Sequence, residues 1–138
     1  MKLRIYMTLW VCFLVIGGIQ AQASLKFNET FPSNNAVKIN LDVENDKIEV
    51  KTIKGSRIVV ETMITISSPN DRLLEFIAEG GRYKLEHHFD EGKNEMNLVS
   101  KKNKDIITIK GKEIEEHFTY TIYVPESTKY VNETLASR

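Results

Sequence analysis

Cysteine is nearly absent from this sequence. The one cysteine among the 138 residues is Cys12, and it lies in an N-terminal apolar segment that we expect export to remove. The remaining chain then has no disulfide, no thiol nucleophile and no thiolate ligand for a metal ion. This absence excludes disulfide-stapled folds and cysteine enzymes, so the fold must depend on an ordinary hydrophobic core.

The sequence also lacks the motifs that mark common catalytic and phosphate-binding sites. No G-x-S-x-G nucleophile motif is present. Gly80 and Gly81 follow an expected helix instead of preceding one, which is typical of a helix end. Glu115 and Glu116 are neighbours in an expected strand, so their side chains point to opposite faces and do not form an acid/base pair. We therefore expect a protein that is not an enzyme and needs no cofactor.

Neither sign of charge is in excess. The chain has 19 basic and 19 acidic residues, and the two signs are interspersed. The one basic cluster, "KKNK" at residues 101–104, lies at an expected turn and has no interleaved aromatic residues. A nucleic-acid-binding surface needs an extended basic patch, so we expect no nucleic acid among the partners.

The N-terminal residues have the three parts of an export signal. Lys2 and Arg4 form a basic start, the apolar run Leu9–Ile19 follows, and Ala21 and Ala23 are small residues placed for a signal peptidase. The run is shorter than the about 20 apolar residues of a bilayer-spanning helix. We expect residues 1–23 to be a signal cleaved after Ala23, with no stable membrane span afterwards; an uncleaved anchor and a lipoprotein signal at the cysteine are the alternatives. The expected location is the periplasm, the cell surface or the medium.

Alternation of apolar and polar residues with period two fills most of the remaining chain, and this pattern indicates half-buried strands. In one such stretch, Ile39 and Leu41 point one way and Asn40 points the other. The links between the stretches are short, and a parallel crossover needs a dozen or more residues, so we expect antiparallel neighbours. The pattern predicts about seven strands, at residues 36–43, 47–53, 57–66, 82–90, 94–100, 105–110 and 114–124.

One segment breaks the alternation and predicts a helix from about Pro69 to Glu79. Ser68 is placed as its N-cap, Pro69 lies at the first helical position, and Gly80 follows the last turn. We expect an apolar stripe of this helix to pack on the sheet. The stripe consists of Leu73, Leu74, Phe76 and Ile77.

Together these patterns predict a mainly β fold, an antiparallel sheet or sandwich of about seven strands with one packed α-helix. A lead at residues 24–35 precedes the β-rich domain at residues 36–126. Residues 127–138 have weak structural signals, and we expect them to form a flexible tail.

The stretch "KLEHHFDEG" carries two adjacent histidines. On a strand, His87 points to the apolar face and His88 to the polar face, so they cannot bind the same ion. Glu86, His88 and Asp90 share the polar face, and His117 lies on the polar face of the last expected strand. If these two strands pair, the four side chains could converge on one metal ion. An ordinary solvated face is the alternative, and it is favoured because no known ligand motif is present.

Two tyrosines near the end of the chain are candidates for a binding surface. Tyr123 lies on the polar face of the last expected strand, and Tyr130 follows that strand. Exposed tyrosines are enriched in protein interfaces. The alternative is that both pack against the sheet, and it is favoured because strands are enriched in aromatic residues.

Two stretches carry a resemblance to a known family. "FTYTIYVPES" ends a long alternating strand in a proline, and "VKINLDVENDKIEVKTIKGSRIVVET" has the pattern of short hairpins. Over residues 36–126 the chain resembles the leading β-rich region of bacterial candidate adhesins, which are exported proteins of the β-solenoid type. The stacked rungs of that family are missing after Pro125. The resemblance implies a role at the cell surface or envelope and supplies no catalytic residues.

We therefore expect an exported, non-catalytic adhesion or interaction module at the cell envelope, with a protein or a surface glycan as its partner. Its sheet faces, exposed edges or loop tips would recognise that partner. The alternative is an exported protein that binds a small ligand or a metal ion through the polar face around His88.

Overall fold

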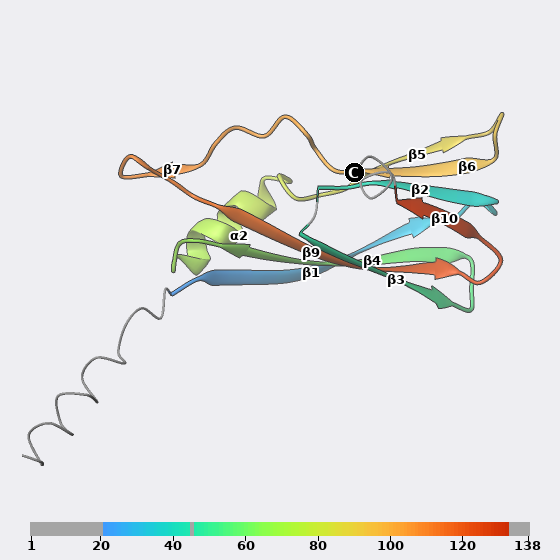
Figure 1. Ribbon diagram of the computed structural model, residues 1–138, viewed down its shortest axis with the longest axis horizontal. Helices are drawn as coiled ribbons and strands as arrows, with labels where there is room; N and C mark the ends of the chain where they lie inside the picture. The colour runs from blue at the N-terminus through green and yellow to red at the C-terminus, as the bar shows by residue number, and fades with distance from the viewer. Residues whose placement is uncertain (1–20, 45, 133–138) are drawn as a thin grey trace, which may run out of the picture.

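The fold is mainly β with one packed helix, as the sequence predicts. The computed structural model describes residues 21–44 and 46–132, so most of the expected signal and the end of the expected tail lie outside the described residues. Within them, ten strands form two mixed four-stranded sheets and a two-stranded hairpin, together with one short helix (Figure 1). The two larger sheets face each other as a sandwich.

Sheet A has the strand order β1-β4-β9-β3. These strands are β1 (Ala23–Pro32), β4 (Arg57–Ile66), β9 (Glu116–Pro125) and β3 (Lys47–Ile53). β4 pairs antiparallel with both β1 and β9, and β3 pairs parallel with β9. On β4 the side chains of Ile58, Val60, Ile64 and Ile66 are buried, which confirms the face predicted by alternation.

Sheet B has the strand order β10-β2-β6-β5. These strands are β10 (Lys129–Asn132), β2 (Lys38–Asp42), β6 (Glu95–Val99) and β5 (Glu86–Asp90). β2 pairs parallel with both β10 and β6, and β5 pairs antiparallel with β6. Ile39 and Leu41 are fully buried, as predicted.

Three strand pairs are therefore parallel, and the expectation that short links leave only antiparallel neighbours is wrong. The short links mostly join strands of different sheets: β2 leads into β3, and β9 leads into β10. A short link excludes a parallel pair only when it joins two neighbours within one sheet. The link at residues 54–56 joins two strands of sheet A, but β9 lies between them.

Two strands lie where the sequence analysis placed none. β1 occupies most of the expected lead and begins at Ala23, whose N–H donates to the Ser68 carbonyl at 2.8 Å. β10 occupies part of the expected tail. Conversely, the strand expected at residues 105–110 is reduced to β7 (Thr108–Ile109), which forms a hairpin with β8 (Lys112–Glu113).

The helix α2 (Asp71–Glu79) begins later than the sequence predicts. Its N-cap is Asn70 instead of Ser68, because the Asn70 side-chain oxygen accepts the N–H of Leu73 at 3.1 Å. An N-cap side chain has to reach the free N–H groups of the first turn, and Asn70 does so. Among the described residues, no helix has the length and apolar character needed to cross a bilayer.

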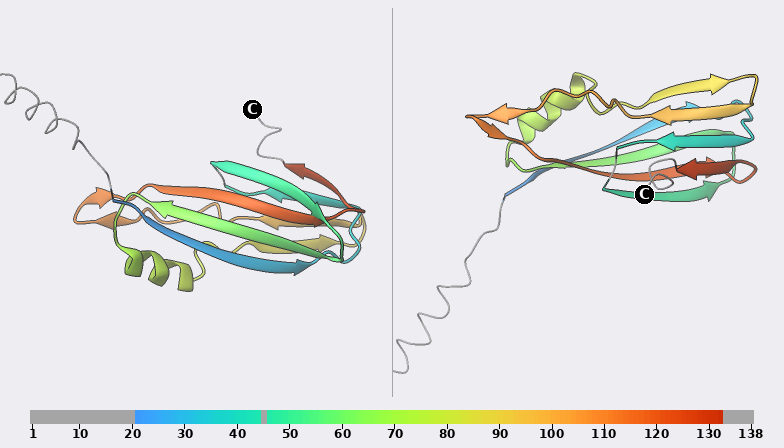
Figure 2. Two further views of the ribbon diagram at one scale, coloured as in Figure 1. Left: turned by 90° about the horizontal axis from the view of Figure 1, so that it is seen from below. Right: turned by 45° about the horizontal axis from the view of Figure 1, so that its top comes forward.

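α2 packs against β1 at the end of the sandwich that sheet B does not reach (Figures 1 and 2). Leu74 is buried there, whereas Phe76 is 73% exposed. The apolar stripe that contacts the sheet is therefore narrower than expected.

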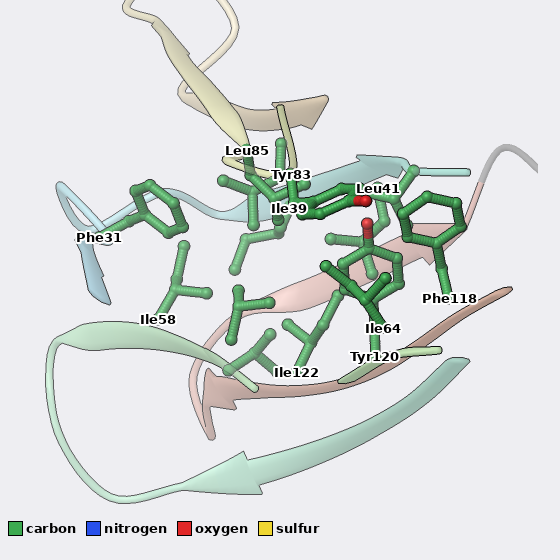
Figure 3. Packing of buried hydrophobic residues seen from close by; sticks show 14 of the residues in the cluster. Phe31, Ile39, Leu41, Ile58, Ile64, Tyr83, Leu85, Phe118, Tyr120 and Ile122 are labelled. Atoms are coloured by element: carbon green, nitrogen blue, oxygen red, sulfur yellow. The ribbon is translucent and has the colours of Figure 1, made fainter. Parts of the chain in front are cut away.

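The hydrophobic core lies between the two sheets (Figure 3). Tyr120 and Ile122 of β9 face Ile39 and Leu41 of β2 across this space. Tyr83, which precedes β5, packs edge-on against Phe118 with 5.8 Å between ring centroids. Burial of these large side chains from both sheets holds the sandwich together.

Candidate functional site

The four residues proposed as metal ligands lie on opposite outer faces of the sandwich. Glu86, His88 and Asp90 lie on the outer face of β5 in sheet B, and His117 lies on the outer face of β9 in sheet A. The strand pairing on which that site depended is therefore wrong, because both sheets separate the two sets of side chains. Within residues 21–44 and 46–132, no three His, Cys, Asp or Glu side chains form a group that could hold a metal ion.

His88 instead belongs to a polar surface on the outside of sheet B. Asn40 Nδ2 donates to Glu95 Oε2 and to Asn97 Oδ1, each at 2.9 Å. Asn97 Nδ2 in turn donates to the His88 carbonyl at 3.5 Å. The hydrogen bond from Asn40 holds the pKa of Glu95 below its usual value. These cross-strand hydrogen bonds fit the solvated-face alternative.

The two candidate tyrosines lie on different sheets and do not share a surface. Tyr123 is half-buried on the outer face of β9, with Lys51 Nζ 5.9 Å from the centre of its ring. Tyr130 lies on β10, the edge strand of sheet B, and is 47% exposed. Of the two, Tyr130 is the better placed to contact a partner.

Exposed apolar side chains lie on both faces of β10: Tyr130 pairs with Ile39 on the inner side of sheet B, and Val131 pairs with Asn40 on the outer side. Val131 follows Tyr130 and is 39% exposed; Val37, whose carbonyl accepts the N–H of Lys129 at 3.1 Å, is 54% exposed. We call Val37, Tyr130 and Val131 the β10 patch. The other exposed large apolar side chains in the described part of the chain are Met63, Phe76 and Ile106. Those three lie on three different segments, and isolated exposure of this kind is ordinary.

A charged cleft of about 370 Å³ lies between the start of β9, the link from β2 to β3 and residues 102–107. The segment that leads from β6 to β9 runs over the end of the sandwich where α2 lies (Figure 1). Residues of both charge signs line the cleft. They come from segments that are distant in the sequence, so no local motif indicates them.

The main feature of the cleft is a bidentate ion pair between Arg82 and Glu116. Arg82 Nε donates to Glu116 Oε1 at 3.0 Å, and Arg82 Nη2 donates to Glu116 Oε2 at 2.6 Å. Arg82 Nη2 also donates to the Asp105 carbonyl at 2.8 Å, which ties the covering segment to the sheet. Burial raises the pKa of Glu116, but the hydrogen bonds and charge of Arg82, together with Tyr83 and the charge of Lys104, outweigh burial and leave the pKa below its usual value.

A second cation, Lys104, also lines the cleft. The Lys104 side chain is only 9% exposed, its Nζ lies 2.7 Å from Glu44 Oε2, and it lies 4.2 Å from the centre of the Phe118 ring. The interpretation of the "KKNK" cluster as a solvated loop therefore does not hold for Lys104. On the rim, His117 Nδ1 lies 3.4 Å from Asp46 Oδ2, and that oxygen also accepts the N–H of Phe118 at 2.7 Å. Arg82 and Lys104 are thus each paired with a carboxylate.

Comparison with known proteins gives one distant structural likeness. No family model matches the chain, and no curated protein matches its sequence. Its structure is similar to that of a candidate cell adhesion protein from Clostridium sporogenes, with a TM-score of 0.38 and 11% sequence identity over 79% of this chain. The chain spans 45% of the length of that protein. A likeness this distant carries no argument about function.

Proposed function

We propose that this protein is an exported, non-catalytic adhesion or interaction module of the cell envelope, with the β10 patch as its recognition surface. The observation that carries the proposal is the exposure of Tyr130 and Val131 on an edge strand, with Tyr130 on the inner side of sheet B and Val131 on its outer side. Tyrosine is enriched among the residues that contribute most to binding energy.

The charged cleft supports the non-catalytic part of the proposal. Its two buried cations are each engaged by a carboxylate, Arg82 by Glu116 and Lys104 by Glu44. Acid–base catalysis needs a group that is free to exchange a proton near neutral pH, and these pairs hold their charges in place. Their role is to fasten the segment between β6 and β9 to the sandwich.

Binding of labelled protein to an envelope fraction of the source cells tests the proposal. The protein is purified after expression of the full-length chain, and bound protein is measured by sedimentation. The double substitution Tyr130→Ser with Val131→Ser should weaken binding about tenfold or more, since it removes the apolar contacts. His88→Ala and Tyr123→Ser are the matched controls and should leave binding unchanged.

Two results of this assay would count against the proposal. Undiminished binding by the double variant would show that the β10 patch is not the recognition surface. No binding by the unaltered protein would contradict an envelope-binding module altogether.

Binding of a small ligand or a metal ion is the second candidate function, and the cleft of about 370 Å³ favours it. A cleft of this size lined by both signs of charge could hold a small polar ligand. Zinc tests the metal-binding form of this alternative at the rim, where His117 and Asp46 lie together, although no three metal-ligating side chains of the described residues form a group that could hold an ion. Under this alternative, saturating zinc raises the melting temperature, His117→Ala removes the rise and His88→Ala does not. An unchanged melting temperature would dismiss the metal-binding form of this function.

A further inference from the structure

One long edge of sheet A has no partner strand among the described residues. Ser33 N–H donates to the Ser56 carbonyl at 3.1 Å, and the β1–β4 pairing continues in the same register. Both backbone groups of a residue in an antiparallel strand point to the same side, so the odd-numbered residues of β1 face β4. The even-numbered residues therefore present their N–H and C=O groups to the free edge. These residues are Ser24, Lys26, Asn28 and Thr30.

β1 is the longest of the four edge strands of the two larger sheets in the described part of the chain, and Lys26 and the inward-pointing Glu29 are its charged residues. Natural sheets shield their edges by keeping edge strands short or by placing charges on them. β10 has four residues and β5 has five, and β3 carries Lys47, Glu49 and Lys51 on its outer face. β1 has ten residues. Its outer face carries one charge, Lys26, which pairs with Glu61 at 3.2 Å.

A groove of about 250 Å³ lies beside this edge, between β1 and α2. Leu25 and Phe27 of β1 and Ala78 of α2 form its apolar walls, and Glu79 and Lys84 complete the lining. A strand added to the edge would lie about 4.8 Å from β1. Every second side chain of that strand would then lie next to the inner face of β1, on the side where α2 packs (Figure 2).

We propose that the free edge of β1 binds an extended peptide segment of a partner protein as a fifth strand of sheet A. The segment has apolar residues at alternate positions, which fill the groove. It also has an acidic residue beside Lys84, whose charge lowers the pKa of Glu29 but which forms none of the close ion pairs in the described part of the chain. In this mode of recognition, main-chain hydrogen bonds provide affinity and the side-chain groove provides specificity.

This surface is separate from the β10 patch. β1 and β10 are edge strands of different sheets, and Figure 2 shows them on opposite sides of the sandwich. The inference therefore does not depend on the proposed function, and each can fail without the other.

A synthetic peptide tests the inference on the unaltered protein, purified after expression of the full-length chain. The probe has about eight residues, enough to span the free edge at about 3.3 Å per residue; it alternates valine with threonine and ends in glutamate. Saturating peptide should slow hydrogen exchange about tenfold or more at the amides of Ser24, Lys26, Asn28 and Thr30. The same peptide with every amide N-methylated cannot donate hydrogen bonds and should have no effect. No slowing at these amides, or slowing only at other strands, would overturn the inference.

Substitutions locate the contact. Asn28→Pro removes one N–H from the free edge and none that faces β4, so it should weaken peptide binding about tenfold, whereas Asn28→Ala should change it by less than about twofold. Lys84→Glu should weaken binding about fivefold through charge repulsion. Equal binding by the Pro and Ala variants would overturn the strand-addition geometry. If Asn28→Pro does not fold, the N-methylated peptide decides alone.

The other possible occupant of the β1 edge is a second copy of this chain, and sedimentation of the unaltered protein tests for it. A monomer at the concentrations of the peptide titration agrees with the inference. A dimer that Lys26→Pro and Asn28→Pro both abolish would overturn it, because a second copy of this chain would then occupy the edge.

Discussion

Thr62 is the polar member of the otherwise apolar inner face of β4. Its side chain is fully buried, and its hydroxyl has no hydrogen-bond partner among the described residues. A buried hydroxyl without a partner costs about 1–3 kcal/mol. Thr62→Val keeps the shape and removes the hydroxyl, so we expect the free energy of unfolding to rise by about 1 kcal/mol in urea denaturation.

The matched control for this prediction is Thr65→Val, on the outer face of the same strand. We expect its effect to be within about 0.5 kcal/mol, as is usual for surface substitutions. A clear loss of stability in Thr62→Val would contradict the account of this strand, because it would mean that the hydroxyl makes a stabilising contact.

Glu116 makes the stability of the protein depend on pH. Burial raises its pKa, but the hydrogen bonds and charge of Arg82, together with Tyr83 and the charge of Lys104, bring the pKa below the ordinary value of 4.5. A carboxyl with a lowered pKa in the folded state stabilises the fold above its ordinary pKa, and this contribution is lost as the pH falls through the lowered value. Glu116→Gln should therefore cost roughly 2 kcal/mol at pH 7, less than for a fully buried ion pair.

Urea denaturation between pH 3 and pH 7 checks this prediction. The difference in unfolding free energy between Glu116→Gln and the unaltered protein should shrink below a pH of about 4.5. A difference that stays constant across this range would show that the charge of Glu116 does not matter to the fold.

At the scale of the element, only every second residue of β1 directs its backbone N–H and C=O groups toward a neighbouring strand. Its odd-numbered residues face β4 and its even-numbered residues face the free edge. In the protein alone, hydrogen exchange followed by NMR should be slow at Leu25 and Phe27 and about a hundredfold faster at Lys26 and Asn28. Uniform protection along β1 would mean that the edge is already covered.

The strands that the sequence predicts well are those with one strongly apolar face. β4 and β9 alternate clearly, and their inward side chains are buried as predicted. β1 was missed because its inner face includes the carboxylate of Glu29, which accepts the Leu85 N–H at 3.2 Å. Alternation also shows which way a side chain points but not what covers it. His87 points to the inner face yet is exposed, because β5 is an edge strand.

The candidate site was less predictable than the strands. Tyr130 is 47% exposed, whereas the sequence analysis favoured packing of this side chain against the sheet. The pairing of Arg82 with Glu116 joins residues 34 positions apart and has no local pattern. The metal hypothesis failed at the level of strand order, because β5 and β9 lie in different sheets. Strand order depends on contacts between distant segments, which periodicity does not describe.

At the scale of the whole molecule, the sandwich has two different ends. The two sheets cover each other at one end, whereas α2 and the segment with β7 and β8 cover sheet A at the other (Figure 1). The β10 patch and the free edge of β1 lie on opposite sides of this body (Figure 2). The arrangement leaves room for both proposed partners at once.

Site-specific photocrosslinking in living cells tests the central claim most directly. A benzophenone side chain is placed in turn at positions 130, 131, 123 and 88 of the full-length chain. The proposed recognition surface predicts the same covalent adduct at positions 130 and 131 and none at positions 123 and 88. No adduct at position 130, or an identical adduct at all four positions, would contradict the claim.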